Sequence, residues 1–365
     1  MNIINQYEPS YGREEIDAVN AYLNSGAWLT EFKKTRELEE MVCAFTGSKY
    51  CAAIANGTVS LFVMLKAVGI GHGDEVIVPD LTMAATPNAV VLAGAIPVFA
   101  DIEEKNLCLD VEQVKKSITK KTKAIIHVSM NGRAGSLLEL KKLCEKKGIF
   151  LFEDAAQSLG SFYKGKHLGT IGTTGSFSLS MPKIITTGQG GFLVTNSKSQ
   201  YDKIKLLKDF GRRKGGEDFY KTIGWNFKFT DLQAVFGIEQ FKKLPARMEF
   251  KKKIFRLYQN LLSEVPQVRF FATDIESTTP WFIDIIIPNR NKLIKHLMSH
   301  GIVSRPVYPA LHLQPAYKNS PFVKSKPHHP SAEKMAREVL WLPSSFSLTE
   351  ENIQTICKAI KDFFN

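Results

Sequence analysis

A lysine and an acid that can act together stand close in this sequence. Lys183 lies in a segment that runs from Phe177 to Gly191, and Asp154 begins an upstream Asp-Ala-Ala-Gln run that ends at Gln157. A lysine amine can hold the aldehyde of pyridoxal phosphate as a Schiff base, and a carboxylate can keep the pyridine nitrogen protonated so that the ring accepts electrons. The pair therefore predicts a site for pyridoxal 5'-phosphate.

Each of these residues has a commoner structural explanation when it is taken alone. A single lysine is usually a solvated surface charge, and an aspartate after a strand is often the N-cap of the helix that follows. Asn56-Gly57-Thr58, before the helical run 59–68, is more often a turn and an N-cap than a phosphate site, although amides at a helix start do bind phosphate. Ser178 is by itself an ordinary strand serine. Their presence together in one chain favours the cofactor site.

Short apolar runs alternate with amphipathic segments from about residue 45 to 195, which is typical of a mostly parallel sheet covered by helices. Asp154 falls at the carboxyl end of one run, where open α/β sheets gather their sites. The segment 136–147 predicts a helix that ends at Gly148. We expect seven strands in one sheet, at 51–55, 75–78, 97–100, 124–130, 149–153, 175–179 and 191–195.

The chain is expected to fold into two packed domains. Its 365 residues, 44% of them hydrophobic, exceed the usual length of a single domain. After Asp231 a helical stretch resumes beyond Pro245, and strand-like runs at 268–288 precede a helix near 291–301. We predict a large cofactor-binding domain over residues 1–245 and a smaller C-terminal α/β domain over 246–365.

The formal charge of +12 is compatible with nucleic-acid binding, but the basic residues are spread along the chain. The densest run, 242–256, has apolar residues at helical spacing, so Lys251, Lys252 and Lys253 are expected in solvent beside a packed face. A nucleic-acid partner is therefore disfavoured. A basic field would still attract an anionic substrate such as a nucleotide diphosphate.

The sequence shows neither a membrane-spanning or signal segment nor a cysteine pattern typical of disulfides or zinc. No apolar run approaches the roughly 18 to 20 residues of a membrane span, and residues 1–6 lack the layout of a signal peptide, so no membrane contact and a cytoplasmic location are expected. The five cysteines are scattered and include no Cys-x-x-Cys pair, which fits neither a disulfide framework nor a zinc site. We expect reduced cysteines and no metal.

The ordered motifs resemble the DegT/DnrJ/EryC1/StrS family of sugar aminotransferases, which are fold-type I enzymes that use pyridoxal phosphate. The resemblance runs over nearly the whole chain, from Tyr7 to the C-terminal helix at 351–363. The segments that carry it are Asn56-Gly57-Thr58, 73–79 (Gly-Asp-Glu-Val-Ile-Val-Pro), 153–157 (Glu-Asp-Ala-Ala-Gln), 163–166 with Gly169, the Lys183 segment, 224–227 (Gly-Trp-Asn-Phe) and 305–309 (Arg-Pro-Val-Tyr-Pro) with His312.

The resemblance implies a role for each matching residue. Lys183 would carry the cofactor and shuttle a proton to the sugar carbon, Asp154 would pair with the ring nitrogen, and Gln157 would lie by the phenolic oxygen. Asn226 would reach the cofactor phosphate from a neighbouring subunit, which implies a homodimer with shared active sites. The remaining expected contacts are Gly57, Thr58 and Ser178 to the phosphate, and Trp28, Lys228, Arg305, Tyr308 and His312 to the substrate.

Three segments depart from the family pattern and indicate a subgroup with its own substrate. Met83 stands where many relatives place an aromatic residue on the cofactor ring, although a thioether can still cover a ring face. The segment 129–133 replaces a His-x-Tyr-Gly motif after the fourth strand. Lys228 replaces an arginine, whose planar fork would hold an anion differently.

The function implied by the resemblance is transfer of the amino group of L-glutamate, which leaves 2-oxoglutarate, to C4 of a nucleotide diphosphate 4-keto-6-deoxyhexose. The layout is most similar to the subgroup that makes GDP-perosamine for O-antigen, lipopolysaccharide or other surface glycans, and next to dTDP-linked 4-aminotransferases. Alternatives are dTDP- or UDP-sugar amination at C3 or C4, a sugar 3-dehydratase, whose members carry histidine in place of Lys183, and a non-catalytic ligand-binding or regulatory protein. The glycine pattern of dinucleotide-binding folds is absent.

Overall fold

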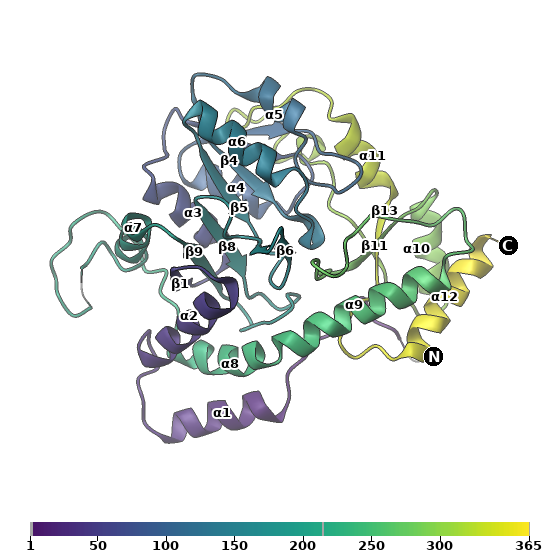
Figure 1. The fold of residues 1–365 in the computed structure, drawn as a ribbon, viewed down its shortest axis with the longest axis horizontal. Helices are drawn as coiled ribbons and strands as arrows, with labels where there is room; N and C mark the ends of the chain where they lie inside the picture. Colours follow the sequence, from purple (N-terminus) through teal and green to yellow (C-terminus); the bar gives the residue numbers. More distant parts are fainter. Residues whose placement is uncertain (1–2, 214, 365) are drawn as a thin grey trace.

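The computed structural model describes residues 3–213 and 215–364, and a seven-stranded sheet forms its centre (Figure 1). The strand order is β1-β9-β8-β5-β4-β2-β3. Strand β9 pairs antiparallel with both neighbours, whereas every pair from β8 to β3 is parallel. The predicted mostly parallel sheet is therefore confirmed. Its strands are β1 (Tyr50–Ile54), β2 (Glu75–Pro79), β3 (Ile96–Ala100), β4 (Thr122–Val128), β5 (Phe150–Asp154), β8 (Thr174–Ser178) and β9 (Gly191–Thr195).

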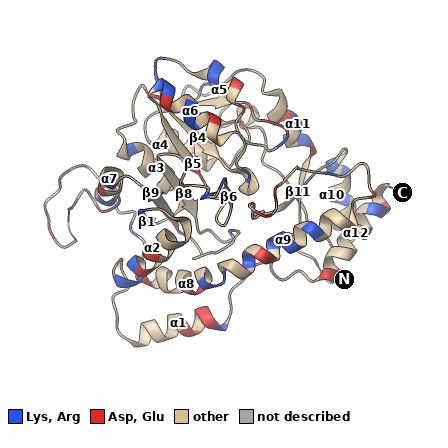
Figure 2. Cartoon of the chain, viewed as in Figure 1, with Lys and Arg blue, Asp and Glu red and all other residues tan. Residues whose placement is uncertain are grey.

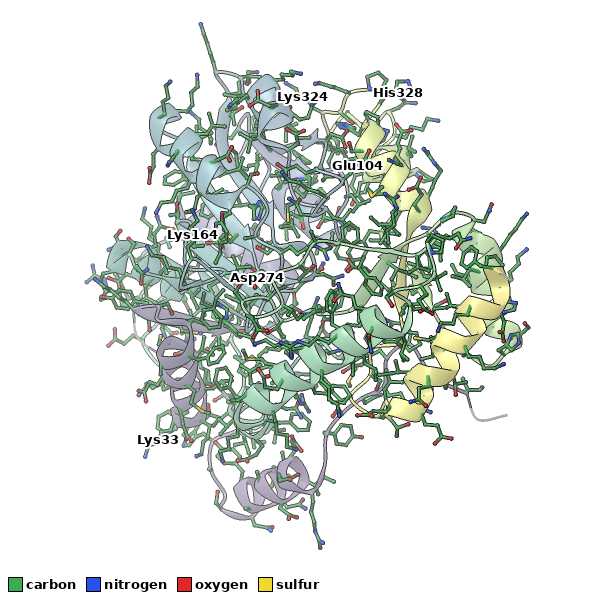
Figure 3. The ribbon with its side chains drawn as sticks, turned by 45° about the vertical axis from the view of Figure 1, so that its right-hand side comes forward. Lys33, Glu104, Lys164, Asp274, Lys324 and His328 are labelled. Carbon is green, nitrogen blue, oxygen red and sulfur yellow. The ribbon has the colours of Figure 1, made fainter. Side chains whose placement is uncertain are left out.

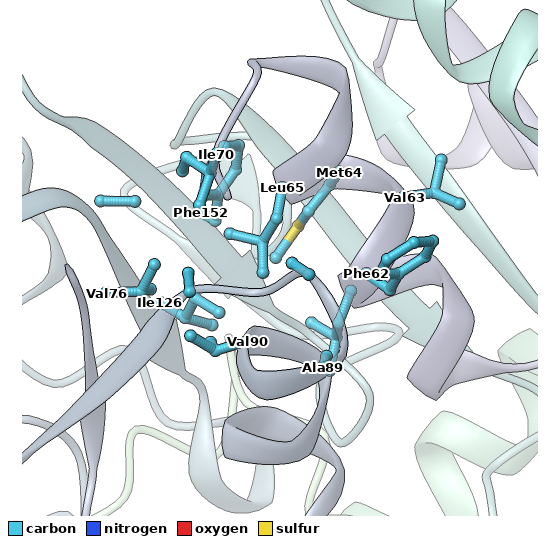
Figure 4. Close-up of a cluster of buried hydrophobic side chains, with 14 of the residues drawn as sticks. Phe62, Val63, Met64, Leu65, Ile70, Val76, Ala89, Val90, Ile126 and Phe152 are labelled. Atoms are coloured by element: carbon cyan, nitrogen blue, oxygen red, sulfur yellow. The ribbon is translucent and has the colours of Figure 1, made fainter. Parts of the chain in front are cut away.

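Helices cover both faces of the sheet because successive strand residues point to opposite sides. In β2, Val76 and Val78 join the core formed with α3 and α4, whereas Ile77 packs with α5 and α6. Figure 4 shows the first of these cores, in which Val90 of α4 lies beside Val76 of β2 and Ile126 of β4. The helices concerned are α2 (Lys33–Thr46), α3 (Gly57–Ala67), α4 (Ala85–Leu92), α5 (Val111–Ser117), α6 (Leu137–Lys147), α7 (Lys198–Lys208) and α8 (Asp231–Lys242).

The helix predicted before Gly148 is α6, and its end shows why the glycine is there. Gly148 follows the last helical residue with a φ of 66°, a left-handed conformation that a residue without Cβ adopts at low cost. The side chains of Leu137, Leu140 and Cys144 are buried on one face of this helix. Cys144 is one of five free cysteines among the described residues, as expected.

The C-terminal part has its own antiparallel sheet, in the order β10-β11-β13-β12, and its own hydrophobic core. Helices α10 and α12 pack against each other beside this sheet. The elements are β10 (Arg269–Phe270), β11 (Ile283–Ile286), β12 (Arg305–Pro306), β13 (Val339–Leu342), α9 (Leu244–Leu261), α10 (Arg290–Ser299), α11 (Pro330–Glu338) and α12 (Glu350–Phe364).

The predicted domain boundary, between residues 245 and 246, falls inside α9. Leu244, at the start of α9, packs in a core with α2 and α8, whereas Ile254 and Tyr258 belong to the C-terminal core. The N-terminal segment also crosses the boundary, because the N–H of Ile4 donates to the carbonyl of Gly301 at 2.8 Å. The boundary itself stays a prediction. Helix α1 (Arg13–Asn24) follows this segment and packs on α8.

Both signs of charge are interspersed over the outer helices (Figure 2). The expectation that Lys251 and Lys252 lie in solvent is wrong, because both residues are buried. The ammonium of Lys251 donates to the carbonyl of Ser344, and that of Lys252 donates to the carbonyl of Glu276 at 3.1 Å. Lys253 is exposed, as expected, and pairs with the exposed Glu350. Within the described residues, no helix combines the length and apolarity needed to span a bilayer.

Candidate active site

Lys183 lies in the loop between β8 and β9, where contacts from distant parts of the chain fix the backbone before it. The indole N–H of Trp281 donates to the carbonyl of Pro182 at 2.6 Å, and the hydroxyl of Tyr7 donates to the carbonyl of Met181. The Lys183 Nζ lies 3.9 Å from the centroid of the Trp281 ring. These contacts aim the lysine side chain into the enclosed space beside the indole.

The environment of Lys183 favours a neutral amine. The residue as a whole is partly exposed, but its ammonium group is enclosed, and this burial lowers the pKa of Lys183 to about 8 although the charge of Asp154 opposes the shift. An amine with a pKa close to neutral has an unprotonated fraction that can act as a nucleophile and a base. The structure thus gives the predicted catalytic lysine the chemical property that its role requires.

Asp154 is the last residue of β5 and is buried. Its Oδ2 accepts a hydrogen bond from the Thr86 hydroxyl at 2.8 Å, and its Oδ1 accepts one from the Ala156 N–H at 3.2 Å. Burial raises the pKa of Asp154, and Thr86, the Ala156 N–H and Lys183 each oppose that rise. Residues 155–159 form turns and not a helix, so the alternative of a helix N-cap is wrong. Two hydrogen bonds therefore hold the buried Asp154 carboxylate at the carboxyl edge of the sheet.

The first turn of α3 lies so close to Ser178 that only a residue without a Cβ fits at position 57. The Asn56 Oδ1 accepts a hydrogen bond from the Val59 N–H at 3.0 Å, so the predicted N-cap is present. A Cβ added to Gly57 would lie 2.9 Å from the Ser178 Cβ. Thr58 stands in the same turn, so its amide, that of Gly57 and the serine hydroxyl can share a phosphate. The motif can therefore be both a helix N-cap and a phosphate site.

Gln157 is oriented by the segment that departs from the family pattern. Its Oε1 accepts a hydrogen bond from the backbone N–H of Asn131 at 3.0 Å, which leaves its amide N–H groups as donors for an anionic oxygen. The Asn131 side chain donates to Asp284 at 2.7 Å, and Arg133 holds the same carboxylate with two hydrogen bonds. The segment 129–133 therefore locks the glutamine side of the site onto β11.

The residues predicted to contact the substrate fall into separate groups. Tyr308 is buried, and that burial raises its pKa; the Arg305 charge opposes this rise and the Asp154 charge adds to it. His312 is buried elsewhere, with its Nδ1 2.7 Å from Asp80 Oδ2. Met83 is half exposed in the loop before α4. The substrate and ring-stacking roles of these residues stay predictions.

Trp28 and Lys228 line a pocket of about 1060 Å³ that none of the predicted cofactor residues lines. Lys228 Nζ lies 2.9 Å from Asp209 Oδ1 in its wall, and Asp209 forms a backbone bridge with Asn226. A separate cavity of about 10 Å³ is lined by Gln157, Ser178, Lys183 and Trp281. Within one chain, the large pocket and the lysine are thus apart.

No sequence pattern points to two residues that shape the site, Trp281 and Thr86. Trp281 lies in an apolar run of the C-terminal part, and Thr86 lies in the first turn of α4. Their partners, Pro182 and Asp154, are distant in the sequence, so only the folded chain brings them together. A buried carboxylate is a strong reason to expect a nearby donor, but the sequence does not identify it.

The polar groups match pyridoxal phosphate at its three polar ends. The amine of Lys183 suits the aldehyde, the buried carboxylate of Asp154 suits the ring nitrogen, and the close approach of Gly57 to Ser178 at the start of α3 suits the phosphate. The α/β fold and this site are those expected of an enzyme that uses pyridoxal phosphate.

The chain belongs to the DegT/DnrJ/EryC1/StrS aminotransferase family, whose model matches residues 9–361. It is 33% identical to a GDP-perosamine synthase of Vibrio cholerae over 98% of both chains, and 33% identical to one of Escherichia coli O157:H7 over 100% of both. The pyridoxal phosphate form of the putative sugar aminotransferase Spr1654 from Streptococcus pneumoniae superposes with a TM-score of 0.93 at 28% identity, covering 99% of this chain and 98% of that one. The resemblance in the sequence is confirmed.

Proposed function

We propose that this enzyme transfers the amino group of L-glutamate to C4 of a nucleotide-linked 4-keto-6-deoxyhexose. The observation that carries the proposal is the Lys183 amine, whose pKa is lowered to about 8 beside the Asp154 carboxylate. The full-length similarity to GDP-perosamine synthases favours a GDP-linked sugar and a perosamine-type product. Such a product would serve O-antigen or another surface glycan, and the cytoplasmic location stays the prediction made from the sequence.

When bound, pyridoxal phosphate supplies an aldehyde that takes up the amino group and a ring that spreads negative charge from the neighbouring carbon. Lys183 would hold the cofactor through its amine, and its Nζ, once released, would move the proton between the cofactor and the sugar carbon. Asp154 would hold a proton at the ring nitrogen, and the Gln157 amide would donate to the phenolic oxygen. Trp281 covers one side of the lysine amine and keeps water from it.

The large pocket supports an anionic substrate. Its lining includes seven basic side chains and three acidic ones, with aromatic residues beside them. Arginine and lysine hold diphosphate oxygens, and Trp28, which is 71% exposed, offers a face on which a base or sugar can pack. The alternative substrates, dTDP- and UDP-linked keto-sugars aminated at C3 or C4, present the same diphosphate. The presence of Lys183 disfavours the dehydratase, and the pairing of Lys183 with Asp154 disfavours a non-catalytic role.

We also propose a homodimer in which each subunit completes the other's site. Asn226 and Lys228 lie in the segment after α7, which extends from the body of the chain at the left of Figure 1. Phe219, Tyr220 and Ile223 on this segment expose more than half of their surface, as expected of side chains that a second subunit covers. The separation of the large pocket from Lys183 within one chain agrees with this arrangement.

The substrate is tested by incubating the enzyme with pyridoxal phosphate, L-glutamate and, separately, GDP-4-keto-6-deoxymannose or dTDP-4-keto-6-deoxyglucose. Mass spectrometry should show replacement of the carbonyl oxygen by an amino group in the GDP sugar. Conversion of the cofactor to its amine form by glutamate without amination of either sugar would leave an aminotransferase with a different acceptor. No reaction with glutamate would contradict the proposal.

The shared site is tested by mixing two defective variants. Lys183→Ala and Asn226→Ala each impair every site of their own homodimer, but a mixed dimer has one site with both residues intact. Co-expression should restore roughly a quarter of the wild-type activity by statistical assembly. If the mixture stays as inactive as the separate variants, the two residues act in the same subunit.

A further inference from the structure

A second cluster of chemically active side chains lies where the loop after β2 meets the C-terminal part. One ligand atom each of Asp80, His312 and His329 lie within 4.8 Å of one another, and all three residues are buried. Glu333 of α11 faces His312 from the other side, with its Oε1 3.4 Å from the His312 Nε2. The proposed aminotransferase reaction uses neither His329 nor Glu333.

Asp80 fixes the orientation of His312. The Asp80 Oδ1 accepts the backbone N–H of His312 at 2.8 Å, and Oδ2 lies 2.7 Å from Nδ1 of the same residue. Both carboxylate oxygens are therefore engaged by His312. The proton is expected on Nδ1, so that Nε2 carries the lone pair. A carboxylate that holds one imidazole nitrogen in this way is the usual support of a metal-binding histidine.

The other imidazole nitrogen has no hydrogen-bond partner among the described residues. His312 Nε2 is completely enclosed and makes no hydrogen bond, and the side chain is only 4% exposed. A buried nitrogen of this kind normally has a partner. The 3.4 Å gap to Glu333 is long for a hydrogen bond between charged groups, but two ligands placed about 2.1 Å from a tetrahedral zinc ion are about 3.4 Å apart.

The neighbouring residues hold the remaining ligands in place. The His329 ring packs edge-on to that of His312, with centroids 4.9 Å apart, and its Nε2 lies 3.0 Å from the Ser325 hydroxyl. Asp101 accepts hydrogen bonds from the first N–H groups of α11 and so positions the helix that carries Glu333.

His328 lies beside this group at the surface. Figure 3 shows it at the outer edge of the molecule next to α11, and its Nδ1 lies 3.5 Å from the same Glu333 Oε1. The side chain is 80% exposed, so it can move toward an ion at that oxygen, or water can take its place.

We propose that His312 Nε2, the His329 imidazole and the Glu333 carboxylate bind a divalent zinc-class ion, with Asp80 as the support of His312. Two imidazoles and one carboxylate favour zinc over magnesium or calcium, which prefer oxygen ligands alone. The ion would join α11 to the short 3₁₀ turn Leu311–Leu313 that carries His312, and Asp80 would hold that turn against the loop after β2. The cysteine pattern, from which no metal is expected, says nothing about such a site, because its ligands are histidine and glutamate.

The test measures zinc retained by the full-length holoenzyme. Protein treated with a chelator is equilibrated with zinc chloride, dialysed and analysed by mass spectrometry of the metal, with magnesium chloride in a parallel sample. Wild type should retain one zinc ion and no magnesium per chain, and zinc should raise its unfolding temperature. Glu333→Gln and His329→Gln should weaken zinc binding at least tenfold, whereas His72→Gln at an exposed site should not.

Equal zinc retention by wild type and Glu333→Gln would overturn the proposal. Glu333 is partly exposed, and glutamine has nearly the same size and shape, so this variant is expected to fold even if His329→Gln does not. Circular dichroism and the bound-cofactor absorbance report on folding independently of zinc. None of these readouts depends on the sugar that the enzyme aminates.

Discussion

The Lys183 Nζ lies 3.9 Å from the centre of the Trp281 ring, and the same indole donates its N–H to the carbonyl of Pro182. One side chain thus both covers the amine and fixes the peptide that precedes it. Covering an amine disfavours its charged form, and this burial lowers the pKa of Lys183 to about 8. The tryptophan therefore contributes to the reactivity of the lysine without reacting itself.

Replacement of Trp281 should raise the pKa of Lys183. In Trp281→Ala the amine gains water, so the pH at which the apoenzyme half-maximally takes up pyridoxal phosphate should shift upward from about 8 toward the ordinary lysine value of 10.5. The measurement is the pH dependence of cofactor uptake by absorbance. Trp281→Phe keeps a ring over the amine and should shift much less; equal shifts would show that the lost N–H donor, and not the ring, matters.

Lys183→Ala should abolish turnover and leave a folded protein. Removing the nucleophile and base together is expected to lower kcat by more than about 10³-fold. Activity and circular dichroism check the two parts of the expectation. Lys198→Ala, on an exposed face of α7, provides a matched control. Substantial activity in Lys183→Ala would mean that another amine performs the reaction.

Thr86 should set the acid limit of activity through Asp154. Its hydroxyl lowers the pKa of the carboxylate by hydrogen bonding to the charged form, so Thr86→Val should raise that pKa. The acid limb of the kcat profile with glutamate should then move to higher pH, while Thr86→Ser should restore the wild-type profile. An unchanged profile in Thr86→Val would show that the Ala156 N–H and Lys183 suffice. Asp154→Asn should slow the glutamate half-reaction at every pH.

The buried Lys251 should make stability depend on pH. Burial, and secondarily the charge of Arg247, lowers its pKa to about 7 in the folded chain, whereas the unfolded value is near 10.4. The unfolded chain therefore binds the extra proton between these values, and the lysine destabilises the fold increasingly as the pH falls from about 10 to about 7. Relative to Lys251→Met, wild type should gain about 2.5 kcal/mol between pH 7.5 and 9.5.

Urea unfolding at the two pH values measures this difference. Lys253→Met is the matched control, because Lys253 is exposed on the same helix and should show no such pH dependence. A difference between wild type and Lys251→Met that does not change with pH would mean that Lys251 keeps its charge when buried.

Sequence patterns predict the central sheet well because each strand is a local apolar run. The ends of the seven strands differ from the predictions by no more than two residues. The Lys183 and Asp154 pair is also predictable from the sequence, since the chemistry of a cofactor demands those residue types. The burial of Lys251 and Lys252 is not predictable in this way, because helical periodicity shows which residues share a face but not which other element covers that face.

The same limit applies to the supports of the site. Trp281, Thr86 and Asn131 act through partners that lie elsewhere in the chain, and no local pattern distinguishes them from other residues of their type. Arg133 and Asp284 likewise form a buried pair across 151 positions of sequence. Such pairs appear only when the sheet edge and the C-terminal part are assembled.

Helix α9 passes without interruption from the core of the large sheet into the C-terminal core, over 18 residues or about 27 Å. A continuous helix of this kind is stiff. Rotating the C-terminal core relative to the core of the large sheet would require breaking hydrogen bonds inside α9. The energetic cost of entry to Lys183 therefore falls on the loops around it. Substrate exchange in this enzyme should therefore be a local opening of these loops, while the two cores keep a fixed position relative to each other.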